Sequence, residues 1–200
     1  MKKLSLVMVF LLFAAATYAG GYRVSTQGQR ALAMGHAGVA VVNSAELAFF
    51  NPAGLVFLEN KLNISAGMTG VISNVKYQNE MTGAFAKTDS SLGTPFYLYA
   101  SYSISEKLAL GLSIYTPYGS SVEWPTDWSG SHLVNNIDLQ AIYIQPLISY
   151  KITDNLSVGG GPIFVTGSVN FNRNLNRTLT NEEGKRSNVE IDASGVTNFG

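Results

Sequence analysis

The sequence predicts an all-β membrane protein, namely a transmembrane antiparallel β-barrel preceded by an N-terminal hatch, or plug. Three observations lead to this fold class. A secretory leader opens the chain. Charged residues make up only 13% of it, yet no later segment is a continuous apolar helix, and from residue 62 onward apolar and polar residues alternate. The strands of a barrel spread the membrane signal thinly over many short segments, so a barrel accounts for all three observations.

The leader is the first element of the chain. Lys2 and Lys3 precede an apolar run over residues 4–16, and small residues follow, with cleavage expected after Ala19. A membrane anchor is the alternative, but it would need roughly 20 apolar residues, and Gly20-Gly21 interrupts the run. We therefore predict a signal peptide over residues 1–19, a hatch over residues 20–60 and barrel strands over residues 61–200.

Alternation predicts about six strands after the hatch. They are expected over residues 62–72, 94–103, 108–115, 138–152 and 156–169, with a sixth that begins at residue 189. The glycines at 159–161 and the proline at 162 shift the apolar phase of the fifth strand, which indicates a bulge or bend. Residues 116–136, which include Trp124 and Trp128, lose the alternation and are interpreted as an extracellular loop.

Six strands do not close a barrel, because closed outer-membrane barrels need about eight or more. An open sheet edge cannot face lipid. The chain stops at Gly200 inside a strand pattern. We therefore expect this sequence to be the N-terminal part of a longer protein, and a complete small sandwich is the alternative.

Composition argues against several classes of function. Removing Lys2 and Lys3 from the 13 basic residues leaves 11 against 13 acidic ones, without a basic cluster, so no nucleic acid is expected as a partner. Cysteine is absent, and His36 and His132 have no metal-ligand partner at suitable spacing. No Ser-His-acid arrangement stands out. We expect no enzyme activity, no catalytic residues, no bound metal and no cofactor.

Several stretches of the mature chain carry a family resemblance. Residues 20–28 read GGYRVSTQG, residues 31–38 read ALAMGHAG and residues 49–55 read FFNPAGL. These runs resemble the hatch of the FadL/TodX family of outer-membrane transporters for long-chain fatty acids and other hydrophobic compounds. The resemblance continues through YTPYG at 115–119, PTDW at 125–128 and DL at 138–139.

The resemblance implies a barrel of about fourteen strands in the outer membrane of a Gram-negative-type bacterium, of which this chain supplies the hatch and about six strands. A hydrophobic small molecule, such as a long-chain fatty acid or a hydrocarbon, would be taken up passively and leave through a lateral opening where the third strand kinks. The other implied partners are the lipid bilayer and the barrel-assembly machinery, and the protein would act as a monomer. The alternative is a non-transport barrel of the same family that docks or assembles exported proteins.

The resemblance also assigns residues to the gate. The hatch motif maps to Asn51, Pro52, Ala53 and Gly54, and the kink of the third strand, which forms the lateral gate, maps to Pro117, Tyr118 and Gly119. By likeness to the family, the motif lies against the kink. Pro117 suits a kink independently, because proline cannot donate to the sheet ladder. A plain turn at the end of a strand is the alternative.

Ligand contacts are expected near the hatch, because small-molecule pockets are mostly apolar with a few polar groups. The candidates are Tyr22, Arg23, Val24, Phe49 and Phe50. Packing of the hatch against the barrel would use the same side chains. Arg23 and Arg30 could bind a fatty-acid carboxylate, since a guanidinium matches its two oxygens, or form ion pairs between the hatch and the barrel.

Overall fold

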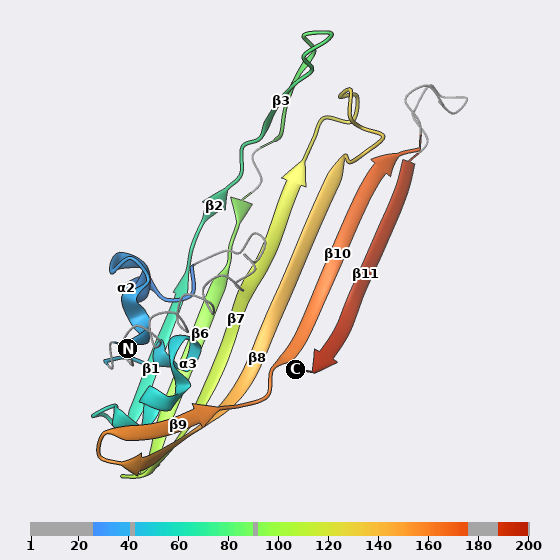
Figure 1. Cartoon of the computed structure of the whole chain (residues 1–200). Coiled ribbons are helices and arrows are strands. Elements are labelled where there is room, and N and C mark those ends of the chain that lie inside the picture. Colours follow the sequence, from blue (N-terminus) through green and yellow to red (C-terminus); the bar gives the residue numbers. More distant parts are fainter. Residues whose placement is uncertain (1–25, 41–42, 90–91, 176–187, 200) are drawn as a thin grey trace, which may run out of the picture.

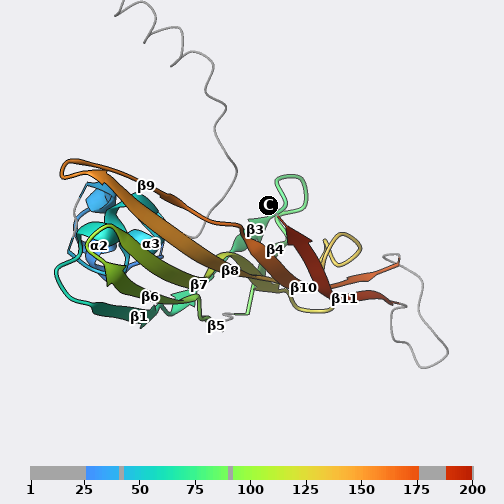
Figure 2. The same cartoon turned by 90° about the horizontal axis from the view of Figure 1, so that it is seen from below.

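The computed structural model describes residues 26–40, 43–89, 92–175 and 188–199, so the predicted signal peptide and residues 20–25 lie outside the described residues. One curved antiparallel sheet dominates the structure, and short helical segments pack inside its curve (Figures 1 and 2). Among the helices in these ranges, none has both the length and the apolar content that a membrane crossing needs.

The elements follow one another in a simple order. The helical segments are α2 (Gln29–Ala33), η1 (Ala37–Val39), α3 (Leu47–Phe50) and η2 (Pro52–Phe57). The strands of the main sheet are β1 (Leu62–Met68), β6 (Phe96–Ser105), β7 (Leu108–Glu123), β8 (Asn136–Thr153), β9 (Leu156–Gly160), β10 (Phe164–Asn174) and β11 (Asn188–Phe199). Two short pairs join β2 (Val71–Ile72) to β5 (Leu92–Gly93) and β3 (Lys76–Gln78) to β4 (Phe85–Lys87).

The main sheet, called the wall below, has the strand order β1-β6-β7-β8-β10-β11, with β9 also paired to β8. Along this path the strands follow their order in the sequence, and each is antiparallel to its neighbours. This arrangement confirms the prediction of an all-β chain with about six successive antiparallel strands. β9 and β10 both pair with β8 and are separated by residues 161–163. This is the predicted bend, and a side chain at Gly161 would overlap the carbonyl of Pro146.

The two faces of the wall differ as the alternation predicts. Leu98, Leu110 and Ile148 are exposed on the convex face, which therefore carries an apolar band suited to lipid. Tyr99 and Ser149 are buried on the concave face, where residues 26–40 and 43–58, called the hatch below, are packed (Figure 2).

The wall is longer than the sequence pattern indicates. β7 continues to Glu123, and its residues from Tyr118 onward pair with β8, so the loop predicted from residue 116 begins only at Trp124. β10 likewise continues to Asn174, beyond the end at residue 169 that the alternation predicts. Ladder hydrogen bonds come from the backbone, so a strand can continue where its side chains are polar, and the apolar alternation then no longer reveals it.

Some structure beyond these strands escaped sequence reasoning. The β3–β4 hairpin extends beyond the main sheet (Figure 1), and the ring of Tyr77 in β3 meets Trp128 edge-on at 5.4 Å. Trp128 in turn stacks on Trp124 at 4.1 Å. The backbone N–H of Asn135 donates to the carbonyl of Asn172 in β10 at 2.7 Å. The loop after β7 is therefore folded onto its neighbours.

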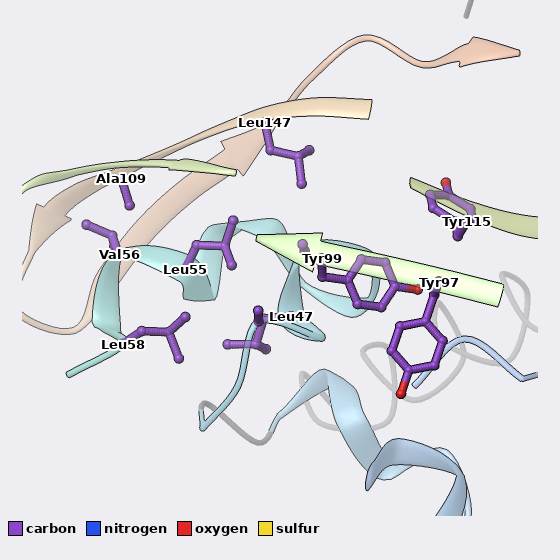
Figure 3. Close-up of a cluster of buried hydrophobic side chains, with 11 residues drawn as sticks. Leu47, Leu55, Val56, Leu58, Tyr97, Tyr99, Ala109, Tyr115 and Leu147 are labelled. Carbon is purple, nitrogen blue, oxygen red and sulfur yellow. The ribbon is translucent and has the colours of Figure 1, made fainter. Parts of the chain in front are cut away.

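The hydrophobic core lies between the hatch and the concave face of the wall (Figure 3). The hatch contributes the side chains of Leu47, Leu55, Val56 and Leu58. The wall contributes those of Tyr97, Tyr99, Ala109, Tyr115 and Leu147. Fully burying one leucine contributes about 1.5–3 kcal/mol, so this cluster is the main force that holds the hatch in the curve of the sheet.

Candidate functional site

The second part of the hatch, residues 45–58 and called the seat segment below, is fixed to β8 and β9. Pro52 begins η2, and Asn51 before it lies outside the helical region (φ −156°, ψ 80°), which proline disfavours for the residue that precedes it. The carbonyl of Ala53 accepts hydrogen bonds from Ser149 Oγ at 2.9 Å and Ser157 Oγ at 2.7 Å. The N–H of Val56 donates to Ser149 Oγ at 3.3 Å. Two serines of the wall therefore hold the start of η2.

Two glycines let the seat segment approach the wall closely. A Cβ at Gly159 would lie 2.7 Å from the backbone nitrogen of Ala53, and a Cβ at Gly111 would lie 2.7 Å from Leu55 Cδ1. Real Cβ atoms essentially never come that close to another atom. The wall thus provides a fitted surface for the hatch motif, and glycine at these two positions is what makes the fit possible.

The first part of the hatch, residues 26–33 and called the latch segment below, is held by polar contacts. Gln27 Nε2 donates to the backbone carbonyl of Thr116 at 3.1 Å. The Gln29 N–H donates to Tyr97 Oη at 3.1 Å, and its side-chain amide donates to Thr69 Oγ1 at 3.1 Å. The buried carboxylate of Glu46 accepts the N–H groups of residues 30 and 31 at 3.3 and 3.2 Å.

The third strand of the wall, β7, loses register between Tyr115 and Tyr118. Tyr115 pairs with Tyr143 and Tyr118 with Ala141, so β7 carries one residue more than β8 over this interval. The extra residue makes a bulge, and alternation inverts beyond it, because side chains on a strand have a period of two. This bulge at Thr116 and Pro117, called the kink below, lies where the sequence predicts a kink.

The kink also ends the pairing between β6 and β7, whose last register pair is Tyr97 with Tyr115. One residue on, Thr116 Oγ1 accepts from the Phe96 N–H at 2.9 Å and donates to the Phe96 carbonyl at 3.2 Å. A side chain thus replaces the backbone ladder at this point. Within the described part of the chain, the next pairing on this edge of β7 is the isolated bridge between Asp89 and Glu123.

A cavity of about 370 Å³ lies in this interrupted part of the wall and is called the wall cavity below. Val71, Leu92 and Pro95 line it from the side of β2 and β5, and Tyr118 and Leu139 line it from β7 and β8. Thr116 and Gly119 also line it. Tyr118 and Gly119, two of the three predicted gate residues, therefore line a cavity that has β7 and β8 on one side and the β2–β5 pair on the other.

Aromatic rings connect the hatch with the wall cavity. Phe49 meets Tyr115 edge-on with ring centroids 4.9 Å apart, Tyr115 lies 5.5 Å from Tyr143, and Tyr143 lies 6.1 Å from Tyr118. These four rings, called the aromatic series below, run along the concave face to the cavity lining. Of the predicted ligand contacts, Phe49 belongs to this series, and Phe50 packs edge-on against Phe49 at 4.9 Å.

The hydrogen bonds of the hatch motif go to β8, β9 and the hatch itself, and its contact with the kink stays a prediction. The motif is bonded to β8 and β9 through Ala53, while Asn51 Nδ2 donates to the carbonyl of Val39 within the hatch at 3.1 Å. Gln27 bonds to Thr116 in the kink itself, and Phe49 contacts Tyr115, the residue before it. The motif fits where the wall offers serine hydroxyls and a bare glycine, and the kink does not offer these.

Most of the remaining predicted residues lie outside the described part of the chain. Tyr22, Arg23 and Val24 lie outside the described residues, and the side chain of Arg30 is exposed. Sequence reasoning missed Gln27, Glu46 and Ser149. Glu46 carried a signal that could have been used, because a carboxylate within the otherwise apolar run of residues 45–50 must find hydrogen-bond donors if it is buried.

Comparisons with known proteins place this geometry in context. The model of one family, described as outer membrane protein transport protein (OMPP1/FadL/TodX), matches residues 10–199. A protein of Neisseria meningitidis serogroup B, whose name describes it as an outer membrane protein, is 29% identical over 145 residues, which are 68% of this chain and 31% of that protein.

A solved structure shares the fold. The crystal structure of a FadL homologue from Pseudomonas aeruginosa superposes with a TM-score of 0.62 at 19% identity, and the match covers 90% of this chain and 48% of the other. The chain therefore spans about a third of the curated relative and about half of the solved structure. The open curved sheet corresponds to part of a barrel wall.

Proposed function

Because this outer membrane protein belongs to the family of outer membrane transport proteins (OMPP1/FadL/TodX), we propose that it forms part of a channel for passive uptake of long-chain fatty acids or similar hydrophobic compounds. In this proposal the wall cavity is a lateral exit and the hatch is its gate. The observation that carries the proposal is the cavity beside the kink, with the hatch bonded to the kink through Gln27. The family is one of transporters and not of enzymes.

The two parts of the hatch differ in how strongly they are held, which supports a gate. The latch segment is held mainly by side-chain hydrogen bonds, each of which contributes about 0.5–1.5 kcal/mol net. The seat segment buries Leu47 and Leu55 almost completely, and each such leucine contributes about 1.5–3 kcal/mol. Local opening selects the weaker part, so the latch segment would release the kink while the seat segment stays in place.

The aromatic series would guide the ligand from the hatch to the exit. Phe49 and Phe50 remain proposed ligand contacts, together with Tyr22, Arg23 and Val24 near the start of the hatch. Tyr118 stands at the cavity end of the series and is 44% exposed, so its ring is accessible to a solute. An uninterrupted third strand would favour the docking alternative, whereas β7 is interrupted at the kink.

The exit can be tested by closing it. In cells that produce the full-length protein containing this chain, Pro117→Val with Gly119→Val restores a backbone donor and adds bulk beside the cavity. We expect uptake of labelled oleate to fall toward that of cells without the protein. Pro146→Val is the matched control, because Pro146 is exposed on β8, opposite Leu112, and does not line the cavity.

Outer-membrane abundance of each variant must equal that of the wild type for this comparison. Unchanged oleate uptake by the double variant would exclude the lateral exit. Co-purification of exported proteins without any bound lipid would support docking instead.

A further inference from the structure

An acidic side chain stands at the mouth of the wall cavity. Asp138 lines the cavity next to Leu139 and Gln140. It is exposed, and its even position on β8 puts it on the same face of the sheet as Ile144 and Ile148, which belong to the exposed apolar band. The carboxylate therefore lies on the convex side, where a solute that leaves through the cavity would emerge.

Nothing in the cavity lining offsets this negative charge. Among the described residues that line it, none is a lysine, arginine or histidine. Apart from Asp138, the polar side chains of this lining are neutral, and Ser73, Thr94 and Ser120 supply hydroxyl groups. A carboxylate that passes this lining finds no cationic partner and meets an acidic side chain at the exit, so passage of the anion is disfavoured.

The lining is nevertheless suited to uncharged solutes. The aromatic series leads to the cavity, and Val71, Leu92 and Leu139 provide apolar surface inside it. Aromatic faces and aliphatic side chains bind apolar solutes, and hydroxyl groups can exchange a hydrogen bond with an alcohol.

We propose that Asp138 is a charge filter for the wall cavity, which favours uncharged hydrophobic solutes over carboxylate anions of the same size. This inference rests on the lateral exit proposed above and ranks its ligands by charge. An exposed charge about 6 Å from the path of a monovalent anion changes the rate at which the anion passes, relative to an uncharged solute, by about threefold in water. Reversing that charge changes the same ratio by about tenfold.

The experiment compares two solutes of equal chain length in cells that produce the full-length protein. Labelled 1-dodecanol is the uncharged solute, and labelled dodecanoate at an alkaline pH is the anion. We expect wild-type cells to prefer the alcohol, Asp138→Asn to lower the ratio of alcohol to carboxylate uptake about threefold and Asp138→Lys to lower it about tenfold. Asp192→Asn is the control. Asp192 lies on β11, two strands beyond Asp138 in the wall, and does not line the cavity.

Ionic strength separates a charge effect from a structural one. At about 0.5 M salt the preference of the wild type should shrink toward that of Asp138→Asn, since exposed charges are screened within a few ångströms. An unchanged ratio in Asp138→Lys, with uptake still dependent on the protein, would overturn the filter and leave the exit intact. Absence of protein-dependent uptake for both solutes would overturn the filter and the exit together.

Discussion

The side-chain amide of Gln27 donates a hydrogen bond to the backbone carbonyl of Thr116, a residue 89 positions further along the chain. This bond joins the start of the hatch to the one place where β7 loses register with β8. It is buried, and it ends on the residue whose hydroxyl also replaces the ladder between β6 and β7.

Replacing Gln27 with alanine should free the latch segment from the kink. The net loss is about 0.5–1.5 kcal/mol, so amide hydrogen exchange over residues 26–33 should accelerate about two- to tenfold in the purified protein. Gln145→Ala removes a similar amide-to-carbonyl bond, from Gln145 Nε2 to Gly161 at an exposed site, and should leave that exchange unchanged. Equal exchange in the two variants would show that Gln27 does not hold the latch.

Adding a methyl group at Gly159 should push the seat segment off the wall. The new Cβ would lie 2.7 Å from the nitrogen of Ala53, whereas a Cβ at Gly160 would meet nothing within 4 Å. We expect Gly159→Ala to cost about 1–3 kcal/mol and to expose η2 to limited proteolysis, and Gly160→Ala to behave like the wild type. Equal protease resistance of the two variants would contradict the close fit.

The two serines that hold Ala53 should not be equivalent. Ser149→Ala leaves the N–H of Val56 without its acceptor in a buried place, which costs about 1–3 kcal/mol. Ser157→Ala should cost less, because Ser149 still donates to the Ala53 carbonyl. Thermal unfolding of both variants in detergent measures the difference, and a larger loss in Ser157→Ala would reverse our assignment.

Gly67 should control the position of Tyr97. A Cβ at Gly67 would lie 2.5 Å from Tyr97 Oη, so Gly67→Ala must displace the ring and withdraw the acceptor of the Gln29 N–H. We expect about 1–3 kcal/mol of destabilisation together with faster exchange of the Gln29 amide. Gly70→Ala, whose Cβ would meet only Leu92 Cδ1 at 3.4 Å, should change neither quantity.

The faces of the wall and its interruption could be predicted from the sequence. Leu98 and Leu110 are outward-facing in the structure as their alternation indicates, because one face must be apolar wherever it meets lipid. Pro117 indicated a gap in the third strand, because it has no N–H to donate. Both predictions depend on properties of single residues and their immediate neighbours.

The attachment of the hatch could not be predicted in the same way. Gln27 bonds to a backbone carbonyl, which has no sequence signature of its own, and Gly159 matters only because η2 lies over it. The family resemblance suggested a contact between the hatch motif and the kink. The structure shows the motif bonded to β8 and β9 through Ala53, and the kink bonded to the hatch through Gln27. Tertiary packing chose the partners, so only the folded chain reveals them.

The additional residue in the kink fixes the meaning of every position that follows it on β7. Up to Tyr115, odd-numbered side chains face the hatch, and from Tyr118 onward even-numbered ones do, because Tyr118 is opposite Ala141. Deleting one residue at Thr116 or Pro117 would straighten the strand and leave Tyr118 opposite Ala141, so every later side chain of β7 would keep its face. The kink is therefore a single inserted residue that can be removed without exchanging inside for outside, whereas a deletion further along β7, with the kink in place, would turn over all the positions that follow it.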